Sequence, residues 1–311
     1  LFPILMKQFI KNTIIFAMPL CIVVLLVWIV DPLNYFGYNN IIPQERKESI
    51  FADSISDMLT FGAKKKVIVS QTDATCLLIG DSRCVPIDVA YWYEKTQQKA
   101  FNFALAGCYV KSATPSFFYA IDHMQNHVNT VYWGHNFWGL SNRERFSDID
   151  DIGSSPLKYV TSPLTWTLIK EVVLKMKTAN IADKQVDKAS AFNVWEGWNE
   201  IISRKQNQVT TEHIRVQPII YELIDSVANY CERHDIRLIH VYPPEYKDLL
   251  AIIQSDSITN AEYQKYLNHL SQYEFYNFNQ GHWIESSNDF VDPMHPKAHV
   301  YNNMIDSIFG N

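Results

Sequence analysis

The sequence predicts an α/β fold: a three-layer α/β/α sandwich with a mainly parallel sheet, preceded by one N-terminal transmembrane helix. An uncharged apolar run near the N-terminus predicts the membrane helix. Short apolar segments that end in glycine or polar residues predict buried strands, and the amphipathic segments between them predict crossover helices. With 311 residues the chain is long enough to bury one large or two small cores around these elements.

The apolar run covers Asn12–Val30 and would span roughly 28 Å as a helix, close to the thickness of one hydrocarbon core. Lys7 and Lys11 precede it and Asp31 follows it, so the positive-inside rule places residues 1–11 in the cytoplasm and the rest of the chain outside. A cleaved signal peptide or a buried core helix are the alternatives. The run is longer than a usual signal-peptide core and no small-residue cleavage site follows it, which favours a single-pass anchor in a bacterial cytoplasmic membrane.

Beyond the membrane helix, residues 31–74 are expected to connect it to a larger domain over residues 75–311. Strands and helices alternate in that domain, which is typical of a parallel sheet covered on both faces. The predicted strands are Thr75–Ile79, Ala100–Leu105, Thr130–Trp133 and Ile236–Tyr242, and the predicted helices are Ser112–His127 and Val216–His234. Ligands of such a sheet gather at the carboxyl ends of its strands.

Residues 140–215 interrupt the alternation and are too long for one crossover. Polar stretches between Trp166, Trp195 and Trp198 predict a largely helical insertion. It could add packing alone, or it could form a lid or an acceptor-binding surface above the sheet.

Three residues could form a nucleophilic site. Ser82 follows a predicted buried strand in Gly80-Asp81-Ser82, and Asp292 and His295 lie three residues apart on a proline-flanked turn near the C-terminus. A serine nucleophile needs a base, and the base needs a partner that fixes its tautomer. Taken singly, each feature could equally be a polar turn or a helix start.

Two further residues could stabilise an oxyanion. The backbone N–H of Gly107 and the side-chain amide of Asn136 each follow a predicted strand, so both are expected at the same edge of the sheet as Ser82. Alone, either could be an ordinary turn residue. No cofactor and no metal ion is expected.

In order along the chain these blocks resemble the SGNH, or GDSL, hydrolase superfamily: Gly80-Asp81-Ser82, Gly107, Gly134-x-Asn136 and Asp292-x-x-His295. The resemblance covers residues 75–311 and implies a flavodoxin-like SGNH fold. It implies that Ser82 is the nucleophile, His295 the base and Asp292 its orienting acid. It also implies an oxyanion hole made of the Ser82 backbone, Gly107 and Asn136.

The chain departs from the usual family pattern at two blocks. Arg83 and Cys84 follow the serine where a hydrophobic residue and Ser or Thr are usual, and Phe137 follows Asn136 where Asp is usual. Such departures permit a catalytically silent domain that binds glycan or supports a membrane complex.

An anchored extracytoplasmic SGNH domain is similar to proteins that work with membrane-bound O-acyltransferases in teichoic-acid D-alanylation or polysaccharide acetylation. The resemblance therefore implies an acyltransferase that passes an acyl group from Ser82 to a cell-surface polysaccharide or teichoic-acid-like polymer. A carbohydrate or lipid esterase with the same triad is the enzymatic alternative.

Charge argues against nucleic acid as a partner, since the net charge is −6 and no long Lys/Arg block occurs. Arg83 could hold an anionic acceptor or pair with a surface acid. Other histidines could serve as bases but are more often structural, namely His135, His240, His282 and His299. Whether Cys84 and Cys108 form a disulfide is open.

Overall fold

The computed structural model describes residues 2–37, 41–43, 47, 57–140, 155–175 and 197–310. The chain divides into two compact units. The anchor unit comprises Leu1–Ile68 and Ile149–Lys188, and the sheet unit comprises Val69–Asp148 and Ala189–Asn311. Each unit is considered by itself.

The sheet unit is built on five parallel strands in the order β2-β1-β3-β4-β5. The strands are β1 (Cys76–Ile79), β2 (Ala100–Asn102), β3 (Thr130–Gly134), β4 (Arg237–Tyr242) and β5 (Phe275–Asn277). This is the 2-1-3-4-5 order of doubly wound folds, in which the connections leave the first strand in one direction and the third in the other. The predicted α/β fold with a parallel sheet is confirmed.

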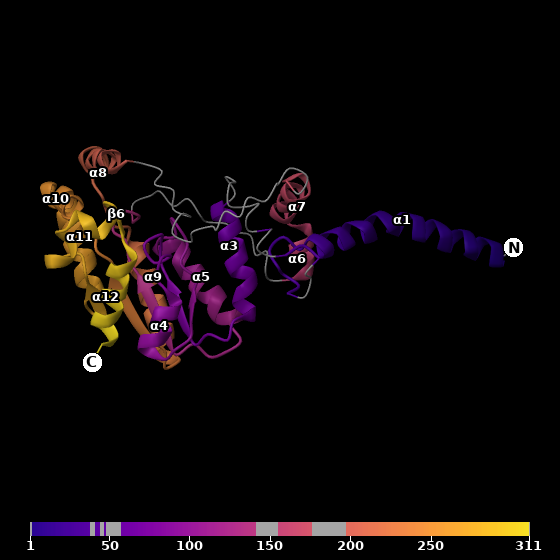
Figure 1. Cartoon of the computed structure of the whole chain (residues 1–311), viewed down its shortest axis with the longest axis horizontal. Helices are drawn as coiled ribbons and strands as arrows, with labels where there is room; N and C mark the ends of the chain where they lie inside the picture. Colours follow the sequence, from indigo (N-terminus) through magenta and orange to yellow (C-terminus); the bar gives the residue numbers. More distant parts are fainter. Residues whose placement is uncertain are drawn as a thin grey trace. The chain divides into compact units, whose positions relative to one another are not determined.

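Helices cover both faces of this sheet (Figure 1). On one face α4 (Val89–Thr96) packs against α12 (Ala298–Phe309), and both bury side chains on the sheet. The apolar residues of α12 recur at helical spacing, which is why one of its faces enters the core. That core contains Trp92, Tyr132, Tyr301, Met304 and Ile305.

A second helix pair, α5 (Val110–His123) and α9 (Pro218–Arg233), packs together and against β1 and β4. Helix α9 falls inside the predicted segment Val216–His234, and α5 overlaps the predicted segment Ser112–His127 but begins two residues before it. Pro218 is the first residue of α9. Proline suits this position because the backbone N–H that it lacks would have no partner within the helix. The half-buried edge strand β5 was not predicted, because three residues carry too short a pattern to recognise.

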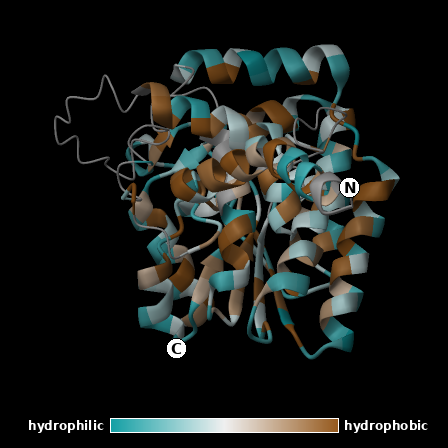
Figure 2. Cartoon of the chain, turned by 90° about the vertical axis from the view of Figure 1, so that its right-hand side faces the viewer, coloured by the Kyte–Doolittle hydropathy of each residue, from teal (hydrophilic) through white to brown (hydrophobic). Residues whose placement is uncertain are grey.

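The sheet unit contains further helices, 3-10 turns and one short antiparallel strand pair. They are α8 (Trp198–Glu212), α10 (Lys247–Ser255), α11 (Ser257–Leu270), the 3-10 turns Val69–Gln71, Gly281–Ile284 and Ser287–Asp289, and the antiparallel pair β6 (Phe290–Asp292) and β7 (His295–Pro296). Helix α8 comes from the predicted insertion, packs on α10 and is mostly hydrophilic (top of Figure 2).

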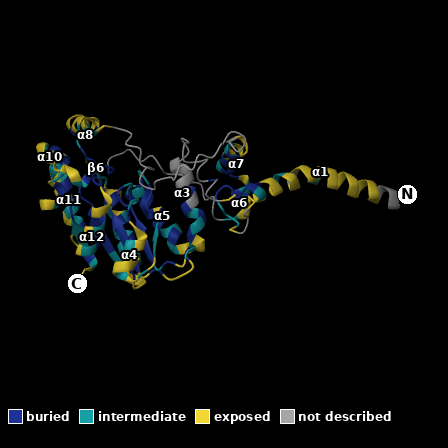
Figure 3. Cartoon of the chain, viewed as in Figure 1, coloured by how far each residue is buried: buried dark blue, intermediate teal, exposed yellow. Residues whose placement is uncertain are grey.

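The anchor unit contains α1 (Phe2–Val30), α3 (Asp57–Ile68), α6 (Pro156–Thr161) and α7 (Pro163–Lys175). Within α1, Met6–Val30 has a mean hydropathy of 2.9, so this helix is long and apolar enough to be a membrane span or a signal sequence. Only 12% of its most apolar stretch is buried, and Figure 3 shows most of the described part of the helix exposed. Helices α6 and α7, which lie in the predicted 140–215 insertion, belong to this unit.

Candidate active site

Ser82, His295 and Asp292 form one hydrogen-bonded chain. Ser82 Oγ lies 2.8 Å from His295 Nε2, and His295 Nδ1 lies 2.7 Å from Asp292 Oδ2. The structure therefore brings together two segments that are 213 residues apart in the sequence. The side chain of Ser82 is half-buried, which leaves its hydroxyl open to a substrate.

The acid and the base are held by the β6–β7 hairpin, in which Asp292 pairs with His295. Asp292 Oδ1 accepts hydrogen bonds from the backbone N–H groups of Met294, at 2.8 Å, and His295, at 3.1 Å. Burial by itself raises the pKa of Asp292, but the hydrogen bonds from His295 and from these N–H groups more than offset it, so the net pKa is lowered. The carboxylate therefore stays ionised beside the imidazole, which suits an acid that orients a base.

Two backbone N–H groups are available for an oxyanion. Within the described part of the chain, neither the Ser82 N–H nor the Gly107 N–H donates to a protein acceptor. Gly107 has a φ of +72°, a conformation that residues with a Cβ rarely adopt, and this explains a glycine at the turn after β2. Both donors follow adjacent strands, β1 and β2, as the sequence predicts.

Asn136, the third predicted donor, is tied to the serine turn. One of its amide N–H groups donates to Asp81 Oδ2, and its Oδ1 accepts from Trp138 N at 2.8 Å. The residue is 5% exposed and follows β3. An asparagine amide has a second N–H, so the contact with Asp81 orients the group without using all of its donors. Its role toward an oxyanion stays a prediction.

Arg83 is fully buried beneath the site, so neither a surface ion pair nor an anionic acceptor explains it; both expectations for this residue were wrong. Its guanidinium donates to Glu245 Oε1 at 2.5 Å, to the backbone oxygen of His135, and to Asp81 Oδ1 at 3.4 Å. Burial lowers the pKa of Arg83, but Asp81 and Glu245 more than reverse this and the net pKa is raised. One cation thus joins the turns after β1, β3 and β4.

Glu245 completes this network and was missed by sequence reasoning. It is fully buried, follows β4 after Pro243-Pro244, and accepts from Trp138 Nε1 at 2.7 Å. Burial raises the pKa of Glu245, and Arg83 offsets only part of that rise. Lys205 of α8 lies 4.6 Å from the ring centre of Trp138, so the insertion contributes a second buried cation to the cluster. The sequence signal that could have identified Glu245 is its position directly after Pro243-Pro244, at the end of a predicted strand.

The glycines that end β1 and β3 leave room for Cys84. A Cβ at Gly80 would lie 2.7 Å from Cys84 Sγ, and one at Gly134 would lie 1.9 Å from the same sulfur. Asn102, at the end of β2, holds the same loop by donating to the backbone oxygens of Cys84, at 2.9 Å, and Val85, at 3.2 Å. Cys84 is thus a buried packing residue.

Gly134→Ala is expected to destabilise the sheet unit by about 1–3 kcal/mol, because its Cβ would overlap Cys84 Sγ. Adding Cys84→Ala removes the sulfur, and the nearest atom would then be the residue 84 Cβ at 3.6 Å, an ordinary contact. The double variant is therefore expected to be more stable than Gly134→Ala alone. Denaturant unfolding of both single variants and the double variant measures this, and additive losses would contradict it.

The cysteines are all thiols, including Cys84 and Cys108, so no disulfide joins that pair. Both are buried. Their position beside site residues reflects packing.

His135 and His240 form a buried, hydrogen-bonded pair. His135 Nε2 lies 2.7 Å from His240 Nδ1, and His135 Nδ1 lies 2.7 Å from the hydroxyl of Tyr266. Burial, with a further contribution from His269, lowers the pKa of His240 to about 3. Burial and the neighbouring His240 lower the pKa of His135 as well. This pair is therefore structural and neutral at pH 7.

Because of this pair, the free energy of unfolding is expected to decrease as the pH is lowered. The folded-state pKa of His240, about 3, lies below the unfolded value of about 6.5. The unfolded chain binds the proton first, so the stabilisation is fully present above pH 6.5 or so and is lost as the pH falls toward about 3. The free energy of unfolding of His240→Leu, measured at pH 7 and pH 5, should fall less than that of the unmodified chain. Equal falls would contradict the prediction.

Comparison with known proteins gives matches among solved structures. No protein-family model and no curated protein matches the chain. A protein assigned to the G-D-S-L family of lipolytic proteins, from Desulfitobacterium hafniense, is 12% identical over 75% of this chain and 97% of its own, with a TM-score of 0.38. A GDSL-like lipase from Bacteroides thetaiotaomicron is 12% identical over 79% and 96%, with a TM-score of 0.38. A protein assigned as an acylhydrolase, from Bacteroides fragilis, is 12% identical over 75% and 83%, with a TM-score of 0.35.

These solved structures are only remotely similar to the chain. Its own features, the β2-β1-β3-β4-β5 strand order and the hydrogen bonds that join Ser82, His295 and Asp292, are those that the SGNH resemblance of the sequence implies. The residue after Asn136 departs from the usual SGNH pattern, and it packs in the core. Phe137, which replaces the usual aspartate, is fully buried and packs edge-to-face on Tyr263, with ring centres 5.1 Å apart.

Proposed function

We propose that this protein is a serine-dependent acyl-transfer enzyme of the SGNH type, held at a membrane by α1. The observation that carries the proposal is the continuous chain from Ser82 Oγ through His295 to Asp292, with both contacts below 3 Å. A half-buried hydroxyl, a base at hydrogen-bond distance and an ionised acid behind that base are the parts that nucleophilic acyl transfer requires.

The first half-reaction forms an acyl-enzyme. Ser82 Oγ attacks the carbonyl carbon of the donor ester while His295 Nε2 takes the hydroxyl proton, and Asp292 stabilises the resulting imidazolium. The oxyanion receives hydrogen bonds from the N–H groups of Ser82 and Gly107 and from the Asn136 amide. The tetrahedral intermediate then breaks its bond to the leaving alcohol, which takes the proton from His295.

In the second half-reaction an acceptor hydroxyl replaces the leaving group. His295 takes its proton, the acceptor oxygen attacks the acyl carbonyl, and Ser82 is released with the proton returned to it. When the acceptor is a sugar or polyol hydroxyl the net reaction is acyl transfer. When it is water the same site acts as an esterase.

We propose a cell-surface polysaccharide or teichoic-acid-like polymer as the acceptor, with the sheet unit periplasmic or extracellular. The placement of the sheet unit outside the cytoplasm is supported by Lys7 and Lys11 before the apolar helix and by Asp31 after it. A membrane-bound O-acyltransferase would supply the acyl donor on this arrangement, because Ser82 then needs a partner that brings an acyl group to the outer face.

Trapping the acyl-enzyme tests this function. The full chain in detergent is mixed with p-nitrophenyl acetate, and mass spectrometry is expected to find one acetyl group on the Ser82 peptide. Added polysaccharide should discharge that group faster than water does. Discharge that no acceptor accelerates would instead support the esterase, and the absence of both the adduct and turnover would leave a silent binding domain.

A further inference from the structure

The apolar helix α1 ends abruptly at Asp31. This residue has a φ of +36°, and its backbone N–H donates to Val27 O at 2.8 Å, which closes the helix with a left-handed residue. Pro32 follows and cannot continue the helix. The last residue of the span is therefore followed immediately by a carboxylate.

That carboxylate is completely buried and satisfied within the anchor unit. Asp31 Oδ1 accepts from Tyr35 N and from the Tyr159 hydroxyl, both at 2.8 Å, and Oδ2 accepts from Phe36 N at 3.0 Å. Lys47 Nζ donates to the Asp31 backbone oxygen at 2.8 Å. An unpaired carboxylate at the end of a hydrocarbon layer would be costly, and these partners remove that cost.

Tyr159 connects this arrangement to α6 and α7. Its ring stacks on Tyr35 with centroids 4.5 Å apart, and burial and the charge of Asp31 raise its pKa, so the hydroxyl remains a donor. Val27 and Val30, in the last turns of α1, share one core with Leu168 and other apolar residues of α7. Helix α7 is therefore fixed at the depth at which the apolar span ends.

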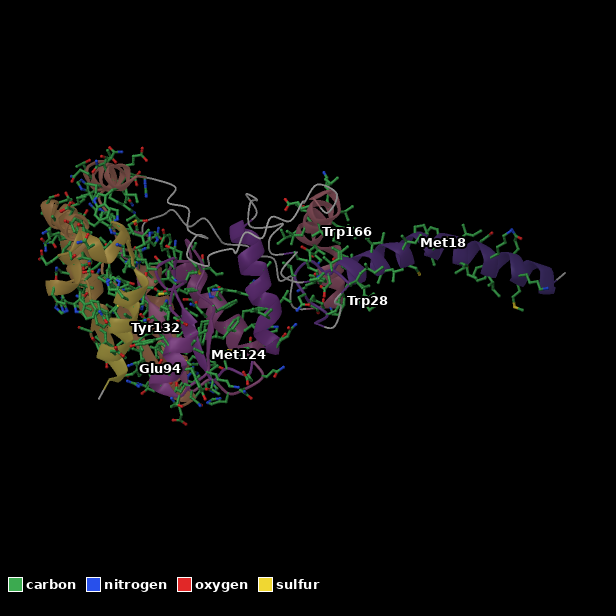
Figure 4. The ribbon with its side chains drawn as sticks, viewed as in Figure 1. Met18, Trp28, Glu94, Met124, Tyr132 and Trp166 are labelled. Atoms are coloured by element: carbon green, nitrogen blue, oxygen red, sulfur yellow. The ribbon has the colours of Figure 1, made fainter. Side chains whose placement is uncertain are left out.

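The side of α7 that faces away from this core carries exposed apolar side chains near its C-terminal end, next to the exposed polar residues Thr167 and Lys170. Val173 is 43% exposed and Leu174 is 58% exposed, and Lys170 lies on the same side. On α6, Leu157 is 73% exposed. Figure 4 shows Trp166 on α7 and Trp28 near the end of α1 at the same end of the anchor unit. Aromatic residues with exposed aliphatic side chains and a lysine that can extend to water are typical of a helix lying in a membrane interface.

We propose that α6 and α7 form an interfacial platform whose outer residues, Leu157, Val173 and Leu174, enter the outer lipid layer beside α1. The inference rests on the proposed membrane anchoring. The occupant is the bilayer, because the exposed apolar side chains belong to helices that pack on the end of the span itself. The buried Asp31 cluster holds the platform at that level.

Depth-resolved fluorescence of the full chain in phosphatidylcholine–phosphatidylglycerol vesicles tests the platform. Cys21, the exposed cysteine, is replaced by alanine, and a polarity-sensitive thiol probe is attached at Leu157→Cys or Leu174→Cys. Two controls are Phe16→Cys on α1, where the native side chain is 88% exposed, and Val89→Cys on α4, where it is 40% exposed. Lipids with a quencher near the headgroup or deep in the chain, and iodide in the water, report the depth.

The platform probes are expected to show a blue-shifted emission, quenching by the shallow lipid quencher and protection from iodide. Phe16→Cys should respond to the deep quencher and Val89→Cys to iodide. If iodide quenches the platform probes as strongly as Val89→Cys while Phe16→Cys still senses deep lipid, the platform is overturned and the anchor stands. If Phe16→Cys also senses no lipid, the anchoring fails too. Protection without lipid quenching that disappears on dilution would indicate a second copy and would likewise overturn the bilayer as occupant.

Discussion

Ser82→Ala is expected to lower the turnover of p-nitrophenyl acetate by about 10³-fold or more, because the substitution removes the atom that forms the acyl-enzyme. Ser82 Oγ is the group that lies 2.8 Å from His295 Nε2. The full chain in detergent is assayed by release of p-nitrophenolate, with thermal unfolding measured in parallel to confirm that the variant is folded. Little change in stability is expected, because the side chain is half-buried and loses only a hydroxyl.

The losses of activity from substitutions at Ser82 and His295 should not be additive, because both residues act in the same catalytic step. His295→Asn is expected to cost about as much as Ser82→Ala, and combining the two should cost little more than either alone. Asp292→Asn should also lower kcat strongly, by up to about 10⁴-fold, because the wrong imidazole tautomer is then favoured. Ser307→Ala is a matched control, since that serine is exposed and its hydroxyl donates to Asn303 O in its own helix. Ser82→Ala retaining full activity would remove this residue from the mechanism.

Arg83→Met is expected to destabilise the sheet unit by about 3–5 kcal/mol, because it leaves the carboxylates of Asp81 and Glu245 buried without their cation. Arg83→Lys should recover only part of the loss, because one ammonium group cannot reproduce the geometry with which the guanidinium reaches Asp81, Glu245 and the His135 carbonyl. Denaturant unfolding measures both.

A matched control for this prediction lies elsewhere in the same unit. Arg237 and Glu274 have the same 2.5 Å nitrogen–oxygen distance as Arg83 and Glu245, but their side chains are 47% and 33% exposed. Arg237→Met is expected to cost at most about 1 kcal/mol, because water replaces the lost partner. Equal losses for the two arginines would show that burial does not govern the contribution of Arg83. A folded Arg83→Lys should also show a lower kcat, because this network holds Asp81 and, through it, Asn136.

The parts of the site that could be predicted were those that short local patterns determine. Strands β1 and β3 are apolar runs ending in glycine, and Ser82 follows the first of them. Asp292 and His295 could be predicted to interact because they are three residues apart on one turn, which places their side chains close together. Gly107 was recognisable because a turn after a strand favours a residue without a Cβ.

The buried network could not be predicted in the same way. Arg83, Glu245 and Lys205 are at least forty residues apart in the sequence, and their local sequences do not indicate that they are buried together. Charged residues are exposed in most proteins, so the ordinary expectation for Arg83 was a surface ion pair. The grouping of α6 and α7 with α1 was hidden for the same reason, because it depends on contacts across 126 residues, such as the hydrogen bond from Leu33 N to the Tyr159 hydroxyl.

The β2-β1-β3-β4-β5 order has a consequence for how this site could change during evolution. Between β1 and β3 the connections depart in opposite directions, and this is the position at which open parallel sheets generally bind ligands. Ser82 follows β1 and Asn136 follows β3. The loops after these strands can lengthen or shorten without repacking the strands themselves. A new acceptor or acyl group could therefore be accommodated by altering those loops, while Ser82, His295 and Asp292 remain unchanged.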